Sequence, residues 1–342
     1  MNPVIDYFDI RYYANISIGS PAQEFRVRLC TAGAEFWVIS KDCTKEYCDK
    51  DKRTGYEHHK YDPDKSSTHE FDGRYYKKSY DGGMVVGHYA KDTLNLGSLT
   101  IKNQPFGSVD TLSGFLASED NDGIMGLGWP SKEDEPPLYN VLHSLDQPLF
   151  TVWLARHDQI REGEAGGAIT YGGLDKLHCG DDIKFVELKN EPQSSWKLKV
   201  DSVWTEKVRI AKEEWYISDT ASPFTYVPSA IFKDITSKIE VVVSGGYYTV
   251  NCDAVKQLKS VTYTIGGHNY TVPASELVLE MQEGGSKCVL AVTNDEKVLG
   301  EPFIRRYCHV YDYGSKRIGL TESKKPEPLR AFRKQLESKF WG

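Results

Sequence analysis

The 342-residue sequence has no long apolar run and no excess of positive charge. No stretch approaches the roughly 20 apolar residues that span a membrane, so we expect no transmembrane segment. The formal net charge is −7. Because nucleic-acid binding needs a basic surface, we do not expect a nucleic acid as partner. Residues 1–6 do not resemble a signal peptide, so either such a segment has been removed or the protein is cytosolic.

A metal-ligand pattern is also missing. The sequence has nine histidines, and neighbours such as His58 and His59 do not have the spacing of a ligand set. We therefore expect no metal and no cofactor.

Helical periodicity is sparse as well, with residues 137–143 and 229–235 the better candidates.

Short alternating or β-branched runs bounded by glycine, asparagine and aspartate dominate instead. Examples are residues 13–18, 25–29 and 261–265. The chain is long enough for two substantial cores, since single cores stop growing near 250–300 residues. The sequence predicts an all-β protein with a few short helices.

Seven cysteines leave one without a partner. The candidate pairs are Cys43–Cys48, which closes a short loop, Cys252–Cys288 in the C-terminal half, and Cys179–Cys308 as the remaining pair. The leftover Cys30 is, taken alone, most simply a buried and inert small side chain. Paired cysteines and two sequons, at Asn15 and Asn269, favour a secreted and N-glycosylated protein.

Two segments of the chain repeat one pattern. Each is a strand followed by a short polar turn, Cys30-Thr31-Ala32 in one half and Asp219-Thr220-Ala221 in the other. Each is followed later by an apolar-apolar-Gly segment, at residues 122–126 and 297–300. A single such segment is common in β proteins, but four in this order are a specific signal.

This ordered set resembles the pepsin-like (family A1) aspartic proteases, in which both turns read Asp-Thr-Gly. The resemblance covers about residues 7–322, and residues 147–154 with the cysteines at 179 and 308 look most like the nematode secreted branch. It implies a bilobal fold with a deep interlobe cleft and a flap hairpin at residues 79–87. The implied domains are an N-terminal lobe (1–175), a C-terminal lobe (176–322) and a basic amphipathic extension (323–342).

The resemblance also assigns roles to individual residues. The two threonines would brace the two turns against each other, and the flap tyrosine would accept a hydrogen bond from a tryptophan. Alanine in place of the third-position glycine would narrow the space for substrate, and Pro223 would remove a backbone donor. The cleft and flap residues implied are Trp37, Tyr80, Thr31, Ala32, Thr220, Ala221 and Ser222.

The family's chemistry uses two carboxyls that share a proton across one water. With Cys30 opposite Asp219 this coupling is lost, because a thiol is a weak donor and a poor acceptor. Nothing in the aligned surroundings would activate Cys30 as a nucleophile. We therefore predict a degenerate dyad with no functional catalytic residue, in a chain that is not an enzyme.

The leading functional hypothesis is a secreted, inactive protease homologue that binds a protein partner, a peptide or an apolar ligand. Modulation of host proteins is a further hypothesis if the source is a parasitic nematode. One alternative is a weak acid-pH endopeptidase that uses Asp219 alone, and another is a carrier that uses the cleft. In the extension, Leu329, Phe332, Leu336 and Phe340 share one helical face, which would dock on a partner, a membrane surface or the protein itself.

Overall fold

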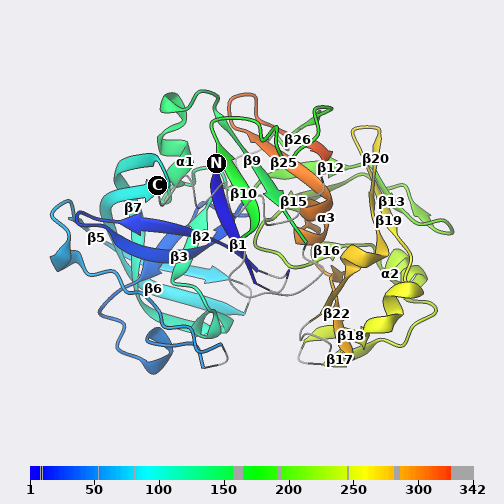
Figure 1. The fold of residues 1–342 in the computed structure, drawn as a ribbon, viewed down its shortest axis with the longest axis horizontal. Coiled ribbons are helices and arrows are strands. Elements are labelled where there is room, and N and C mark those ends of the chain that lie inside the picture. Colours follow the sequence, from blue (N-terminus) through cyan, green and yellow to red (C-terminus); the bar gives the residue numbers. More distant parts are fainter. Residues whose placement is uncertain are drawn as a thin grey trace.

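The computed structural model describes residues 1–324 except 8, 10, 53, 81, 157–164, 191–193, 245 and 281–285. Within these residues the chain is predominantly β with few short helices, which confirms the predicted fold class (Figure 1). The helices are α1 (Pro137–Asn140), α2 (Ser229–Ile235) and α3 (Glu301–Arg306). Single 3-10 turns lie at Glu46–Cys48, Pro63–Lys65, Phe115–Ser118, Leu142–Ser144, Cys252–Lys256 and Ala274–Leu277.

The strands of the described residues form four sheets. The largest contains β1 (Asn2–Tyr7), β2 (Arg11–Ile18), β3 (Gln23–Cys30), β4 (Phe36–Ile39), β5 (Glu70–Tyr80), β6 (Gly83–Leu96), β7 (Leu99–Gly114), β8 (Gly123–Gly126), β9 (Leu149–Leu154), β10 (Ala165–Tyr171), β11 (Lys184–Glu187), β25 (Tyr307–Asp312) and β26 (Arg317–Glu322). Its order is β11-β26-β25-β9-β10-β1-β2-β3-β8-β4-β7-β6-β5.

Three smaller sheets come from the later part of the chain. One contains β12 (Lys197–Val200), β15 (Glu214–Ser218), β16 (Thr225–Tyr226), β23 (Val292–Thr293) and β24 (Val298–Leu299). Another contains β13 (Ser202–Trp204), β14 (Arg209–Ile210), β19 (Val261–Ile265) and β20 (His268–Val272). The last contains β17 (Val242–Ser244), β18 (Tyr247–Asn251), β21 (Val278–Glu280) and β22 (Lys287–Leu290).

The largest sheet joins the two segments that the sequence predicts to be lobes. β25 pairs with β9 in antiparallel register, with His309 opposite Val152, and both strands are buried along their whole length. Below them, Trp196 is fully buried and packs against Phe150 and Tyr311. Residues from before and after position 175 therefore share one core, and the exact lobe boundaries stay a prediction.

Disulfide bonds join Cys43 to Cys48, Cys179 to Cys308 and Cys252 to Cys288, and Cys30 is the free cysteine. Both sequon asparagines, Asn15 on β2 and Asn269 on β20, are exposed to solvent. The apolar face predicted at Leu329, Phe332, Leu336 and Phe340 lies outside the described residues. No helix among the described residues has the length and apolar character needed to cross a bilayer.

Candidate active site

Two loops with the same strand arrangement carry Cys30 and Asp219. Cys30 ends β3, which runs parallel to β8 with Cys30 opposite Gly126. Asp219 directly follows β15, which runs parallel to β24 with Ser218 opposite Leu299. In each half, a third strand then pairs with the bracing strand in antiparallel direction, β4 with β8 and β16 with β24. The repeat in the sequence therefore corresponds to a repeat in the structure.

The glycine of each apolar-apolar-Gly segment allows this close approach. A Cβ at Gly126 would lie 2.4 Å from the carbonyl carbon of Ala34. A Cβ at Gly300 would lie 2.1 Å from the carbonyl oxygen of Phe224. Because real Cβ atoms do not approach backbone this closely, any other residue would push the bracing strand away from its loop.

Thr31 and Thr220 tie the two loops together. The hydroxyl of Thr31 donates to the carbonyl of Ser218 at 2.8 Å and accepts from the backbone N–H of Thr220 at 3.0 Å. The hydroxyl of Thr220 donates to the carbonyl of Leu29 at 2.9 Å. Both threonines are buried, so these hydrogen bonds do not compete with water. The bonds agree with the bracing role predicted for these two residues.

The free thiol and the carboxyl face each other across the two loops. Sγ of Cys30 lies 3.9 Å from Oδ1 of Asp219, and that oxygen also accepts from the backbone N–H of Ala221 at 2.8 Å. Burial raises the pKa of the Asp219 carboxyl, and the Ala221 N–H opposes this shift. Burial, with the Asp219 charge added, also raises the pKa of the Cys30 thiol. The Cys30 thiol therefore stays neutral, whereas the Asp219 carboxyl is the group of the pair that can gain and lose a proton.

The β5–β6 hairpin packs close to this pair. Its turn is fixed by pairing of Tyr80 with Gly83, and the Tyr80 hydroxyl accepts a hydrogen bond from Nε1 of Trp37 at 2.9 Å. Tyr80 and Cys30 pack against the same apolar cluster, which contains Trp37 and Val85. The tryptophan–tyrosine contact expected from the sequence is thus present in the structure.

The remaining predicted positions lie on the same two turns. Ala32 and Ala221 are half-buried, each two residues after the thiol or the carboxyl. Ser222 is also half-buried, and its hydroxyl donates to the carbonyl of Phe224 at 3.1 Å, within its own turn. Its carbonyl accepts from the backbone N–H of Glu301 at 2.8 Å, which connects this turn to α3.

Two charged residues beside the pair were not among the site residues predicted from the sequence. Arg28, on β3, donates from Nη2 to the carbonyl of Ala221 at 2.6 Å. Glu301, the first residue of α3, is fully buried, and neither of its side-chain oxygens has a hydrogen-bond partner among the described residues. Burial raises the pKa of Glu301 to about 8, against the opposing charges of Arg28 and Arg305.

A signal for Arg28 was present in the sequence. In β3 the residues Phe25, Val27 and Leu29 are buried, so every second side chain faces the core. Arg28 must then lie on the same face as Cys30, two residues further on. For Glu301 the signal was an acidic residue directly after an apolar-apolar-Gly segment, where the other half of the chain has Leu127.

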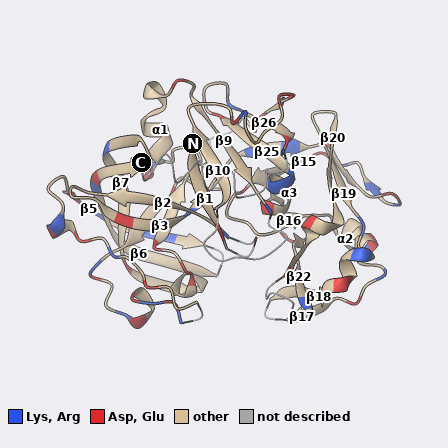
Figure 2. Cartoon of the chain, in the orientation of Figure 1, with Lys and Arg blue, Asp and Glu red and all other residues tan. Residues whose placement is uncertain are grey.

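Lysine, arginine, aspartate and glutamate are interspersed over the described residues (Figure 2). No group of three or more metal-ligating side chains converges anywhere in the described part of the chain. A cavity of about 1010 Å³, lined among others by Trp153, Val255 and Arg305, includes neither Cys30 nor Asp219. The candidate site is therefore defined by the two loops and the hairpin rather than by this cavity.

Two paired loops, the threonine hydrogen bonds between them and the neighbouring hairpin together form the architecture of an aspartic protease. Comparison with family models agrees, since the model described as eukaryotic aspartyl protease matches residues 11–323. The chain belongs to this family. It is 37% identical over 332 residues to "Aspartic protease 1" of Caenorhabditis elegans, covering 93% of this chain and 83% of that protein.

Two further relatives show the breadth of the similarity. "Aspartic protease 17" of Caenorhabditis elegans is 33% identical over 334 residues, covering 94% of this chain and 85% of the relative. "Pepsin A" of Callithrix jacchus is 31% identical over 333 residues, covering 93% of this chain and 82% of the relative. The similarity to nematode relatives agrees with the sequence analysis.

These relatives overturn one prediction. The expectation that the chain is not an enzyme rested on the residue type at Cys30 and on the alanines beside it. The similarity, however, extends over more than nine-tenths of the chain to proteins named as proteases. The prediction was wrong because it gave more weight to one side chain, the thiol of Cys30, than to an architecture that belongs to an enzyme family.

Proposed function

We propose that the protein is a secreted endopeptidase of low activity that uses Asp219 as its one catalytic carboxyl and binds extended peptides between the two loops and the β5–β6 hairpin. The observation that carries this proposal is the contact of Cys30 Sγ with Asp219 Oδ1 at 3.9 Å, with Asp219 as the one carboxyl of the pair. Three disulfides support an oxidising compartment.

The reaction would use Asp219 as general base and then as general acid. The ionised carboxyl takes a proton from a water, and the water oxygen forms a bond to the peptide carbonyl carbon. The neutral Cys30 thiol donates a hydrogen bond to the carbonyl oxygen as it gains negative charge. Asp219 then gives its proton to the peptide nitrogen as the C–N bond breaks, which restores the carboxylate and completes hydrolysis.

The thiol sets the expected rate. A positioned acid or base contributes roughly 10²- to 10⁴-fold, and a thiol is a weaker hydrogen-bond donor than a carboxylic acid. Activity should rise with pH as Asp219 ionises, because only the ionised form can accept a proton from water. Burial raises the pKa of Asp219, so this rise falls at less acidic pH than for an exposed aspartate.

The test compares the protein with its Asp219→Asn variant on denatured haemoglobin between about pH 3 and 7. We expect slow cleavage by the first that rises with pH and is reduced by the peptide-like inhibitor pepstatin. The variant keeps the shape of the side chain and should lose the activity. Equal cleavage by both proteins, or no cleavage by the unmodified protein at any pH in this range, would overturn the proposal.

A further inference from the structure

Arg28 connects the two halves of the site. It lies on β3, two residues before Cys30, and its Nη2 donates to the carbonyl of Ala221 on the opposite loop at 2.6 Å. Its Nη1 lies 3.5 Å from Oε2 of Glu119, and its side chain is only 11% exposed. The Nε of Arg28 has no hydrogen-bond partner among the described residues. A nearly buried guanidinium is thus only partly satisfied by direct contacts.

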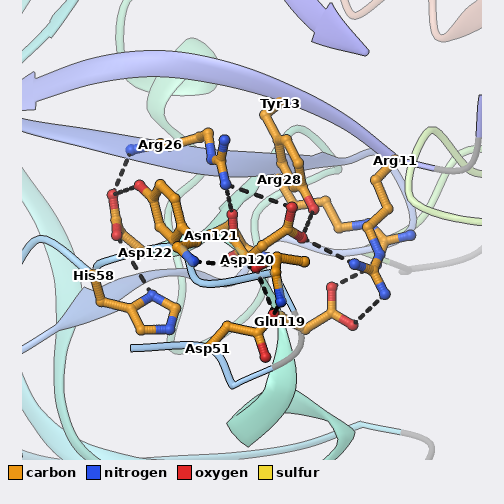
Figure 3. A network of polar contacts seen from close by, with 12 residues as sticks. Arg11, Tyr13, Arg26, Arg28, Asp51, His58, Glu119, Asp120, Asn121 and Asp122 are labelled. Carbon is orange, nitrogen blue, oxygen red and sulfur yellow. Dashed lines mark hydrogen bonds and ion pairs between the residues drawn. The ribbon is translucent and has the colours of Figure 1, made fainter. Parts of the chain in front are cut away.

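The neighbouring arginines are held differently (Figure 3). Arg11 pairs with Asp120 at 2.9 Å and with Glu119 at 3.4 Å. Arg26 contacts Asp120, and its guanidinium lies 3.7 Å from the ring centroid of Tyr56. Both therefore serve the ion-pair network that precedes β8. Arg28 has one long contact to this network and directs its short hydrogen bond to the loop of Asp219.

The charge of Arg28 is offset by acids that belong to the site. Burying a charge is unfavourable unless opposite charges lie nearby. Besides Glu119, the guanidinium interacts electrostatically with Glu301 and with Asp219. A positive charge at this place favours the ionised carboxylate and the thiolate, whereas burial disfavours both.

We propose that Arg28 is a positioning residue for Asp219. It holds the Asp219–Ala221 turn through the Ala221 carbonyl and supplies a positive charge that favours the ionised carboxylate. The role assigned to Asp219 as base rests on the proposed function, but the charge and the hydrogen bond of Arg28 do not. The other charged or titratable groups that act on Asp219 and Cys30 are Glu296, Glu301, Glu35, Tyr80 and Tyr311.

Cys30 provides a probe that needs no enzymatic activity. It is the free cysteine of the chain, it is half-buried, and its thiolate is the form that reacts with an alkylating agent. The alkylation rate at a fixed alkaline pH therefore reports the charge around the pair. We would measure it with iodoacetamide in the intact protein and in the variants Arg28→Met, Arg28→Lys and Arg26→Met.

We expect Arg28→Met to slow alkylation at least about threefold, because loss of the cation disfavours the thiolate. Arg28→Lys should recover most of the rate, since it keeps the charge. Arg26→Met is the matched control on the same strand and should leave the rate unchanged. If Arg28→Met does not fold, Arg28→Gln replaces it, because it also removes the charge while keeping side-chain hydrogen-bond donors.

Equal slowing by Arg28→Met and Arg26→Met would show a structural role only and would overturn the inference. Where cleavage is measurable, Arg28→Met should also move the rise of activity with pH to higher pH, and Arg28→Lys should move it back. An alkylation effect without any cleavage would contradict the proposed function while supporting the role of Arg28. The two proposals can therefore fail separately.

Discussion

Cys30 lies at the end of β3, and Asp219 directly follows β15. Each of these two strands runs parallel to a later strand of the same half of the chain. In both halves a glycine allows that approach, and in both a buried threonine reaches the opposite loop. The backbone arrangement is thus shared, whereas the reactive groups are a thiol and a carboxyl. Backbone pairing and close glycine contacts thus build the same scaffold around two different side chains.

The two halves also differ in the surroundings of these groups. Arg28 extends from the Cys30 half and donates to the Ala221 carbonyl on the Asp219 turn, whereas Arg305 of the other half donates to the carbonyl of Asp9, which is not part of the Cys30 turn. After the bracing glycine, one half continues with the apolar Leu127 and the other with the acid Glu301. The charged groups Arg28 and Glu301 therefore both lie near the Asp219 turn.

The largest expected effect comes from making the two loops chemically alike. Cys30→Asp introduces a second carboxyl opposite Asp219, and two carboxyls at this distance cannot both be ionised, so one becomes the acid and the other the base. We expect the rate of haemoglobin cleavage to rise roughly a hundredfold or more, with a bell-shaped pH dependence. Cys30→Ser is the matched control and should bring no gain.

If Cys30→Asp cleaves haemoglobin no faster than the unmodified protein, the thiol is not what limits the activity. The alanines Ala32 and Ala221 would then be the next candidates, since their methyl groups stand where the family has glycine. Adding Ala32→Gly and Ala221→Gly to Cys30→Asp would separate a limit on substrate approach from a limit on chemistry.

A smaller effect should distinguish the two threonines. Thr31 makes two hydrogen bonds across the loops, and Thr220 makes one through its hydroxyl. Replacing either with valine leaves buried backbone groups unpaired, at roughly 1–3 kcal/mol each. Chemical denaturation should therefore show a larger loss of unfolding free energy for Thr31→Val than for Thr220→Val. Equal losses would mean that the brace is symmetric in energy despite its unequal bonds.

Much of this site was readable from the sequence, for a physical reason. The turns, the glycines and Thr31 and Thr220 perform backbone functions that only a few residue types can fulfil, so their pattern along the chain is specific. The pairing of the cysteines followed from loop closure and elimination. The contact of Trp37 with Tyr80 came from the family resemblance, not from any local pattern.

The charged residues of the site were harder to predict from the sequence, because their roles depend on partners that lie far away along the chain. Arg28 and Ala221 are brought together only by the fold, and the position of Glu301 after an apolar-apolar-Gly segment does not show which charges surround it. The prediction that the chain is not an enzyme was wrong for a related reason, since it relied on one side chain and left the rest of the sequence out of account. Long-range electrostatics around Asp219 therefore required the structure.

The smallest effect concerns the acid that replaces Leu127 in the second half. Burial raises the pKa of Glu301 from 4.5 to about 8, so at neutral pH the folded protein holds a proton that the unfolded chain has released. Stability should then fall as pH rises toward 8, by roughly 1.4 kcal/mol per pH unit for this group. His309, whose pKa burial lowers from 6.5 to about 3, contributes in the opposite direction only below its unfolded value. Unfolding free energies measured between pH 6.5 and 8 should therefore slope less in Glu301→Gln, while Asp6, with its pKa raised by burial to about 8, contributes in the same direction in both proteins. An unchanged slope would show that Glu301 is ionised in the folded state, held by Arg28 and Arg305, and that the second half carries one more negative charge than we infer.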